Sequence, residues 1–269
     1  MENAQHNQPH LKGKTALVTG STGGLGLAIA DALARAGCHI VLHGLDAPQD
    51  AQTHIDNLQR EYGVQALYLK ADLLVQTSIP AMFEKIGATF GGVDILVNNA
   101  VLRHFEPIES LPVQSLNKAL AVNVTAAFHA IQMSLPHMRA SEWGRIFNMT
   151  SVYSARAVAN RLDYITTKTD LVGLTRAVAI ETLDQGITCN ALCPGSVLTP
   201  DIDRRVQALM EKESIDREKA TQLFLLGKQP TGRFVEAAHV ADMLVFLCGP
   251  AGRDITGAIL PVEGGWLAV

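Results

Sequence analysis

Cysteine is scarce in this sequence, and its spacing argues against two kinds of cross-linked site. The 269 residues contain four cysteines, Cys38, Cys189, Cys193 and Cys248, and no Cys-x-x-Cys pair occurs among them. Closely paired cysteines are typical of disulfide frameworks and zinc sites. Cysteines scattered through apolar stretches are instead expected to be buried free thiols. We therefore expect a protein that holds no metal ion.

The sequence also has no excess of basic residues and no long apolar run. Lysine and arginine number 22 against 26 acidic residues, a formal net charge of −4, whereas a nucleic-acid-binding surface needs excess positive charge. No run approaches the roughly 18 apolar residues of a membrane span. Residues 1–10 are polar and lack the apolar core of a signal peptide, so we interpret them as a flexible tail. The expectation is a cytoplasmic protein without nucleic-acid or membrane partners.

The sequence does contain a regular alternation of short strand-like and longer helix-like segments. Seven strands are predicted, at 15–19, 39–43, 66–70, 94–98, 145–149, 187–192 and 258–262. Pro261 favours an edge position for the last strand. The main helices are predicted at 25–36, 51–62, 79–90, 114–138 and 163–183. This order predicts an α/β fold with one Rossmann-type domain over 11–269, a doubly wound parallel sheet with helices on both faces.

Two helical stretches have features that the alternation does not explain. Residues 200–232 are charged at first and end in an apolar run, which predicts a small helical flap over the substrate. The stretch 171–183 is apolar on almost all sides, and a helix of that kind is buried on more than one side. It is either a central core helix or part of a subunit interface, and we expect a homo-oligomer, a dimer or a tetramer.

A glycine-rich turn follows the first predicted strand and opens the first helix. It reads Thr19-Gly-Ser-Thr-Gly-Gly-Leu-Gly26, with glycines at Gly20, Gly24 and Gly26. Glycines allow a tight turn and a close approach of pyrophosphate to backbone N–H groups at a helix N-terminus. In this position the turn predicts a dinucleotide site, although its spacing is not the Gly-x-Gly-x-x-Gly of many dehydrogenases.

Tyr164 and Lys168 are four residues apart on a predicted helix, so their side chains share one face. A free tyrosine titrates near pH ~10, which is too high for a base at neutral pH. A nearby cation stabilises the phenolate and lowers that pKa. The pair is therefore a candidate for general acid–base chemistry, with Ser151 thirteen residues before the tyrosine.

These segments together resemble the short-chain dehydrogenase/reductase family over nearly the whole chain. The resemblance begins with Thr-Gly-x-x-x-Gly-x-Gly at the first turn. It continues, in the order of the family, with Asp72-Leu73, Asn98-Asn99-Ala100, Asn123, Ser151, Tyr164 with Lys168, and Pro194-Gly195-Ser-Val-Leu-Thr199. The resemblance implies a nicotinamide-dependent oxidoreductase, in which the cofactor carries out hydride transfer and the protein supplies position and electrostatics.

The resemblance also implies the role of each catalytic residue. Tyr164 would exchange the hydroxyl proton, while Lys168 would lower the tyrosine pKa and hold the nicotinamide ribose. Ser151 would hydrogen-bond the substrate oxygen, and Asn123 would help to anchor a water chain for proton relay. Taken singly, Asn123 is equally explained as a buried, satisfied amide and Ser151 as a helix N-cap.

The cofactor contacts implied by the resemblance come from several loops. They are Gly20, Thr22, Gly24, Leu25, Gly26, Asp72, Leu73, Asn99, Ala100, Tyr164, Lys168, Pro194, Val197 and Thr199. Asp72 also fits a simple turn former. One departure stands out, because Val101 occupies the fourth position of the family's Asn-Asn-Ala-Gly motif. Glycine permits dihedrals that a β-branched residue avoids, so Val101 is expected to reshape the cofactor pocket.

The choice between NAD and NADP depends on the charge near the adenosine ribose. NADP-dependent members place a basic residue after the second strand or after the first glycine, where it pairs with the 2′-phosphate. Here Ser21 and Thr22 follow the first glycine, and His43-Gly-Leu-Asp46 follows the second strand. The sequence therefore favours NAD, since Asp46 would repel a phosphate.

Short runs narrow the resemblance to bacterial D-3-hydroxybutyrate dehydrogenases. They are Leu11-Lys-Gly-Lys14, Leu135-Pro-His-Met138, Gly186-Ile-Thr-Cys-Asn190, Lys228-Gln-Pro230 and Gly264-Gly-Trp266. Those enzymes hold a small carboxylate with Gln, His and Lys side chains. The corresponding positions here are Arg103, Tyr153, Arg161 and Arg205.

Arginine presents a planar fork suited to carboxylates, so an acidic substrate is expected, larger than hydroxybutyrate or with a second anionic group. The alternative is that Arg161 and Arg205 are surface charges paired with Asp163 or Asp203. We expect an NAD-dependent dehydrogenase of a short 3-hydroxy acid. The alternatives are a 3-oxoacyl-carrier-protein reductase, a sugar or cyclic-alcohol dehydrogenase, and a non-catalytic dinucleotide sensor. Fold alone does not separate these.

Overall fold

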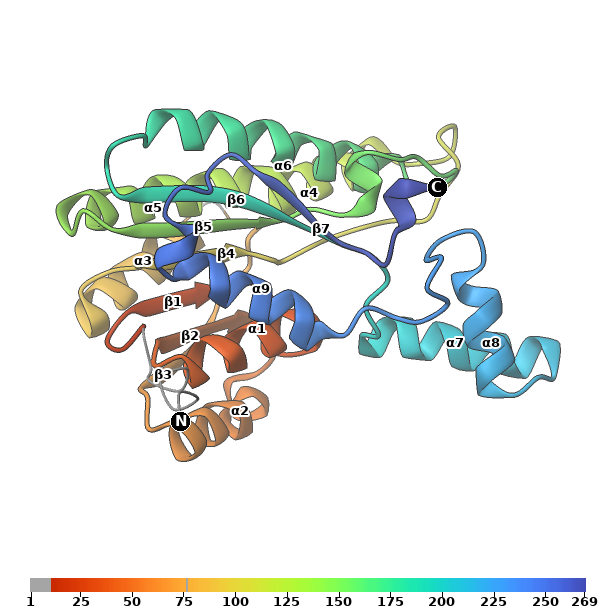
Figure 1. Ribbon diagram of the computed structural model, residues 1–269, viewed down its shortest axis with the longest axis horizontal. Helices are drawn as coiled ribbons and strands as arrows, with labels where there is room; N and C mark the ends of the chain where they lie inside the picture. Colours follow the sequence, from red (N-terminus) through yellow and green to blue (C-terminus); the bar gives the residue numbers. More distant parts are fainter. Residues whose placement is uncertain (1–10, 76) are drawn as a thin grey trace, which may run out of the picture.

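A computed structural model describes residues 11–75 and 77–269; the predicted tail at 1–10 lies outside them. Within these residues, seven strands form one parallel sheet in the order β3-β2-β1-β4-β5-β6-β7 (Figure 1). The strands are β1 (Thr15–Val18), β2 (His39–Gly44), β3 (Ala66–Lys70), β4 (Ile95–Asn98), β5 (Gly144–Met149), β6 (Ile187–Pro194) and β7 (Ile259–Val262). The predicted fold class is confirmed, and so is the edge position of β7, which contains Pro261.

Helices cover both faces of the sheet and enclose two apolar cores. One face packs against α1 (Gly24–Arg35), α2 (Pro48–Tyr62) and α9 (Ala237–Cys248). The other packs against α3 (Ser78–Phe90), α5 (Ala126–Ala140) and α6 (Leu162–Glu181), and α4 (Val113–Leu120) contacts α6. The central strands are buried on both faces because parallel sheets need cover on each side. No helix within the described residues has both the length and the apolarity needed to cross a membrane.

Two helical segments differ from the sequence-based prediction. The predicted helix 114–138 is interrupted by a π-helical turn at Ala121–Thr125, where the Ala126 N–H bonds to the Ala121 carbonyl five residues back. Helix α9 has no counterpart in the prediction. Its sequence is almost uniformly apolar, and periodicity alone cannot assign such a run to a helix or a strand.

Successive strands are added towards one edge of the sheet up to β3 and towards the other edge from β4 onward. Strands β1 and β4 therefore lie side by side, although three helices and two strands separate them in the chain. Hydrogen bonds join the ends of the two strands. The Thr19 hydroxyl accepts from the backbone N–H groups of Asn99 (2.9 Å) and Ala100 (3.0 Å). The Asn99 amide donates to the carbonyls of Thr19 and Gly20, both at 2.9 Å. Such reversal points are where ligands bind in open α/β sheets.

A buried histidine fixes the glycine turn to β2 and to the end of β3. The His43 Nδ1 accepts a hydrogen bond from the Gly20 N–H at 3.1 Å, and Nε2 lies 3.0 Å from the Ala71 carbonyl. A carbonyl only accepts, so Nε2 carries the proton and the ring is neutral. Burial, which outweighs the hydrogen bond to Ala71, lowers the pKa of His43. The histidine therefore acts as a neutral bridge between three segments.

Gly26 allows α1 to lie directly against the glycine turn. A Cβ added at Gly26 would lie 2.3 Å from the Gly20 carbonyl oxygen and 2.6 Å from the Asn99 Nδ2. Both neighbours belong to the bonded junction of β1 and β4, so neither has room to move. At Gly23, by contrast, the backbone is extended and an added Cβ would meet nothing within 4 Å.

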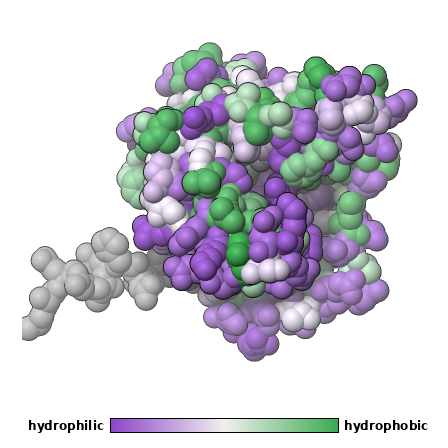
Figure 2. All heavy atoms as spheres, turned by 90° about the vertical axis from the view of Figure 1, so that its right-hand side faces the viewer, coloured by the Kyte–Doolittle hydropathy of each residue, from purple (hydrophilic) through white to green (hydrophobic). Residues whose placement is uncertain are grey.

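The predicted flap region contains two helices, α7 (Pro200–Glu213) and α8 (Arg217–Leu225), which project from the carboxyl end of the sheet (Figure 1). Thr199 caps α7 by accepting from the Ile202 N–H. Gln229, after α8, is buried, accepts from the Ser196 N–H and donates to the Arg233 carbonyl at 2.6 Å. Viewed from this end, apolar side chains are set among hydrophilic ones on the projecting part (Figure 2).

Replacing Gly26 by alanine is expected to destabilise the fold, because the new methyl group overlaps backbone atoms. Overpacking of this kind costs about 1–3 kcal/mol. The control is Gly23→Ala, which adds the same methyl group three residues away in open space and should change the unfolding free energy little. Denaturant unfolding of both variants tests this; equal losses would contradict the packing argument.

Replacing His43 by glutamine is expected to reduce the decrease in unfolding free energy that accompanies a fall in pH. Because the folded-state pKa of His43 is lowered, the unfolded chain takes up a proton first, and the unfolding free energy falls as the pH drops below about 6.5. Glutamine does not titrate there. The measurement is unfolding free energy between pH 5 and 7.5, with His239→Gln at an exposed position as control. Identical slopes for all three proteins would refute a neutral His43.

Candidate active site

A cleft of about 520 Å³ opens at the carboxyl ends of the strands, beside the junction of β1 and β4. It is lined by most of the residues that the sequence predicts for the site, which come from the ends of β1, β4, β5 and β6 with the segments after them and from helix α6. They are Gly20, Gly24, Leu25, Gly26, Asn99, Ala100, Arg103, Ser151, Tyr164, Lys168, Pro194, Val197 and Thr199. The fold thus brings together residues that lie up to 179 positions apart, from Gly20 to Thr199.

The glycine turn fits the phosphates of a dinucleotide. Helix α1 begins at this turn with Gly23 as its N-cap, and no side chain caps it or places a carboxylate in its first turn. Its N-terminal N–H groups therefore lack an intrahelical partner and favour an anion. Gly20 and Gly24 adopt φ values of +62° and +54°, a conformation suited to glycine. The open space at Gly23 lets a ligand approach the backbone.

Tyr164 and Lys168 share the face of α6 that borders the cleft. The Lys168 Nζ lies 5.7 Å from the centre of the Tyr164 ring and donates to the Met149 carbonyl. Burial, with a smaller contribution from the Arg103 cation, lowers the pKa of Lys168 to about 7. Further acceptors that enter the cleft and bond to Nζ would stabilise the ammonium form.

Ser151 follows β5 and caps a short helix, as one of its two sequence-based interpretations predicts. Its backbone is extended, and its Oγ accepts from the Tyr153 N–H at 3.3 Å, which caps the short 3₁₀ helix Val152–Ser154. The same side chain belongs to the lining of the cleft. A serine hydroxyl that accepts one bond still has its own proton to donate, so the cap leaves Ser151 able to bond a ligand oxygen.

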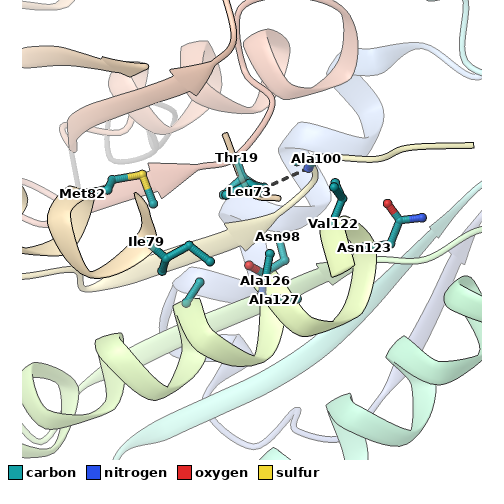
Figure 3. A pocket seen from close by; sticks show the side chains of 11 residues that line it. Thr19, Leu73, Ile79, Met82, Asn98, Ala100, Val122, Asn123, Ala126 and Ala127 are labelled. Atoms are coloured by element: carbon teal, nitrogen blue, oxygen red, sulfur yellow. Dashed lines mark hydrogen bonds between the residues drawn. The ribbon is translucent and has the colours of Figure 1, made fainter. Parts of the chain in front are cut away.

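Asn123 lies behind the cleft rather than in its lining. Its Oδ1 accepts from the Leu102 N–H, and its Nδ2 donates to the Leu102 carbonyl, both at 2.8 Å, and to the Thr167 hydroxyl at 3.0 Å. The side chain is therefore a satisfied amide that ties the loop after β4 to α6. It also borders a second cavity of about 10 Å³ beneath Ala100 (Figure 3), which has room for at most one water.

Three predicted cofactor residues lie outside the cleft lining. Asp72 accepts from the Leu74 N–H at 2.9 Å, as a turn former does, and Leu73 lines the small cavity of Figure 3. Thr22 lies over Gly44 together with Asp46, because a Cβ added at Gly44 would be 2.9 Å from the Thr22 Cγ2 and 3.4 Å from the Asp46 Oδ2. Thr22 and the Asp46 carboxylate are therefore close neighbours at the end of β2.

The acidic partners suggested for Arg161 and Arg205 are engaged elsewhere, so those pairings are wrong. Asp163 accepts from the His104 N–H at 2.9 Å and contacts its Nδ1 at 2.8 Å. Asp203 pairs with Arg217. The arginine that does have an acidic partner near the site is Arg103, whose Nη2 lies 2.6 Å from the Asp201 Oδ2. Sequence proximity was misleading because helix geometry points these carboxylates to other neighbours.

Four cationic side chains lie against aromatic rings near the site, and we call Arg103, Arg161, Arg205 and Lys228 the cation cluster. Arg161 is buried, and its guanidinium lies 4.0 Å from the centre of the Phe105 ring and 4.7 Å from that of Tyr164. Its Nε has no hydrogen-bond partner in the described part of the chain. Burial, together with the Arg103 and Arg205 cations, lowers its pKa, although Tyr164 opposes this.

The flap supplies the other half of the cluster. Arg205 lies 5.2 Å from the Phe105 ring and 5.2 Å from the Phe224 ring, and the Lys228 Nζ lies 3.9 Å from the Phe224 ring. Burial and the neighbouring Arg205 and Arg161 cations lower the pKa of Lys228. Tyr153, the fourth predicted substrate residue, packs edge-on against Tyr164 and Trp266.

Two residues near the site were not singled out by sequence reasoning. Lys228 lies in Lys228-Gln-Pro230, a run that supported the family resemblance but received no role. His43 entered the sequence analysis only as part of a segment that lacks a basic residue to bind the 2′-phosphate of NADP. The signal for His43 was a histidine inside an otherwise apolar strand next to the glycine turn, since a buried histidine requires hydrogen-bond partners.

Val101 departs from the family motif without straining the backbone. It is not among the described residues with positive φ, so its position does not require glycine. Its side chain is 42% exposed and lines the cleft beside Ala100. The expected change to the pocket is therefore one of shape, a branched apolar group at the wall of the cleft.

Comparisons with known proteins agree with this geometry. Residues 20–267 match the family model described as Enoyl-(Acyl carrier protein) reductase. The chain is 42% identical to D-beta-hydroxybutyrate dehydrogenase of Cupriavidus necator and 38% identical to that of Rhizobium meliloti, over 96% and 95% of this chain and 99% of each relative.

A solved structure has the same fold. L-sorbose reductase from Gluconobacter frateurii, complexed with NADPH and L-sorbose, superposes with a TM-score of 0.91 at 30% identity, covering 96% of this chain and 98% of that one. The matches extend over the glycine turn, the Ser151, Tyr164 and Lys168 positions and the flap. The chain belongs to the short-chain dehydrogenase/reductase family and is an oxidoreductase that acts on CH–OH groups.

Proposed function

We propose that this protein interconverts a secondary alcohol and a ketone on a small acidic substrate with NAD(H), in the manner of a 3-hydroxybutyrate dehydrogenase. One observation carries the proposal: Arg161, which has no acidic partner among residues 11–75 and 77–269, lies 4.7 Å from the centre of the Tyr164 ring. A cation at that distance from the candidate base favours an anionic group on the substrate. The relatives named D-beta-hydroxybutyrate dehydrogenase act on such a substrate.

The chain's own residues account for the movement of the proton. In oxidation, the Tyr164 phenolate takes the hydroxyl proton, and the Ser151 Oγ–H donates to the same substrate oxygen. Lys168, buried beside Tyr164, stabilises the phenolate when its amine is charged and would hold the nicotinamide ribose of a bound cofactor. Asn123 positions the loop after β4 against α6. A bound nicotinamide ring supplies the hydride acceptor.

NAD is the proposed cofactor because of the charge at the end of β2. The Asp46 carboxylate lies over Gly44 next to Thr22, where the adenosine ribose is expected. A 2′-phosphate there would be repelled by a neighbouring carboxylate. L-sorbose reductase binds NADPH in its solved structure. Comparing the activity of this chain with NAD and with NADP tests the proposed preference.

We also propose a cytoplasmic homo-oligomer, a tetramer or a dimer. Helix α6 buries one face in the core but leaves Ile180 70% exposed, and Leu183, in the turn after the helix, is 50% exposed. On neighbouring α5, Phe128 is 46% and Met133 39% exposed. Apolar side chains gathered on adjacent helices are typical of subunit interfaces, which supports the interface interpretation of the 171–183 stretch.

Replacing Tyr164 by phenylalanine is expected to lower turnover by about 10²–10⁴-fold, the contribution of a positioned acid–base group. Binding of NAD should persist, because the ring and the cleft are retained. The assay scans short hydroxy acids, sugars and neutral alcohols with NAD and NADP, and follows the reduced cofactor by absorbance. Unchanged turnover would refute the catalytic assignment. Preference for NADPH with a carrier-linked substrate would favour a 3-oxoacyl-carrier-protein reductase instead.

Replacing Arg161 by methionine is expected to raise KM for acidic substrates by about 10–100-fold, since hydrogen bonds to charged groups contribute ~1.5–3 kcal/mol. KM for a neutral alcohol of similar size should change little. Methionine retains an apolar side chain to pack between Phe105 and Tyr164. Arg176→Met, an exposed change on the same helix, serves as control. Equal effects on acidic and neutral substrates would contradict a role in binding the anion.

A further inference from the structure

The cation cluster carries more positive charge than one carboxylate offsets. Within the described residues, Asp201 is the acidic residue that pairs with it, and it contacts Arg103 and the exposed Arg204. Arg161, Arg205 and Lys228 form no salt bridge in that part of the chain. These three cations, of which Arg161 is buried, Lys228 half-buried and Arg205 exposed, lie against aromatic rings and repel one another. Leaving such charges without a counter-ion is costly.

The cations occupy two positions rather than one. Arg161 and Arg103 flank the Tyr164 ring, at 4.7 Å and 6.0 Å from its centre. Arg205 and Lys228 flank the Phe224 ring on the flap, at 5.2 Å and 3.9 Å. The Phe105 ring lies between the two groups, 4.0 Å from Arg161 and 5.2 Å from Arg205. Arg161 and Arg205 thus contact the same ring, while Arg103 and Lys228 each extend one of the two positions away from it.

From this arrangement we propose that the substrate is a hydroxy or oxo acid with two anionic groups, one at each position. Arg161, aided by Arg103, binds the anion nearer the reacting carbon, and Arg205 with Lys228 binds the distal one. The inference rests on the proposed function and specifies its substrate class. It also assigns a role to the flap, because Arg205 on α7 and Lys228 after α8 would bind the distal anion of a substrate whose other anion contacts Arg161.

The distal group can be a carboxylate, a sulfonate or a phosphate, since all three bind arginine and lysine through anionic oxygens. The dicarboxylate is the simplest test. The probes are 3-hydroxyglutarate and 3-hydroxyadipate, each beside the monomethyl ester of its distal carboxylate. Each ester keeps the carbon skeleton and removes one charge. Analogues that end in sulfonate or phosphate are run in parallel to identify the preferred group.

With the full-length protein and NAD, kcat/KM for the diacid is expected to exceed that for its monoester by at least about tenfold, the effect of one charged hydrogen bond. Lys228→Met should remove most of this preference, because kcat/KM falls much more for the diacid than for the monoester. Lys219→Met makes the same change at an exposed position of α8 and should retain the preference. Equal kcat/KM for diacid and monoester, or equal losses for both in Lys228→Met, would overturn the inference.

Binding separates this inference from the proposed function. Calorimetric titration of the protein saturated with NADH measures the affinity of each hydroxy acid without turnover. Tighter binding of a diacid than of its monoester, without NAD reduction by any acid, would support the dianion site and overturn the proposed reaction. Equal affinities together with turnover of hydroxybutyrate would leave the reaction standing and overturn the dianion site.

Discussion

The junction between the ends of β1 and β4 is the interaction on which the site depends. The Thr19 hydroxyl and the Asn99 amide bond each strand end to the other, at 2.9–3.0 Å. This junction sets the glycine turn, so that α1 begins with free N–H groups facing the cleft. Because Gly26 lies against the same junction without room for a Cβ, helix, turn and strand form one rigid support.

Electrostatics divides the cleft into an end for phosphates and an end for the substrate. Helix α1 offers its N-terminus on one side, while Arg103 and Arg161 flank the Tyr164 ring on the other. Between them, the burial of Lys168 makes its charge sensitive to what binds, since its pKa of about 7 lies near neutrality. Four positively charged side chains therefore gather near the substrate end of the cleft, although the net charge of the chain is −4.

Much of the fold was predictable because it depends on local patterns. Short β-branched runs and amphipathic helices alternate, and this alternation predicts a parallel sheet with helices on both faces. Secondary structure was predicted wrongly where the local pattern was ambiguous or gave no sign of an irregularity. Helix α9 is an apolar run that could equally be a strand, and the π-helical turn at Ala121–Thr125 interrupts a sequence that looks uniformly helical.

The sequence by itself determined the reaction class, because the Tyr164–Lys168 spacing and the glycine turn are local features that a helix and a strand–helix turn translate directly into geometry. Only the tertiary structure decided which charges are neutralised. Asp163 and Asp203 bond to His104 and Arg217 rather than to Arg161 and Arg205, and Lys228 joins the cluster from a distant segment. Such pairings depend on distances across the folded chain, which sequence order does not encode.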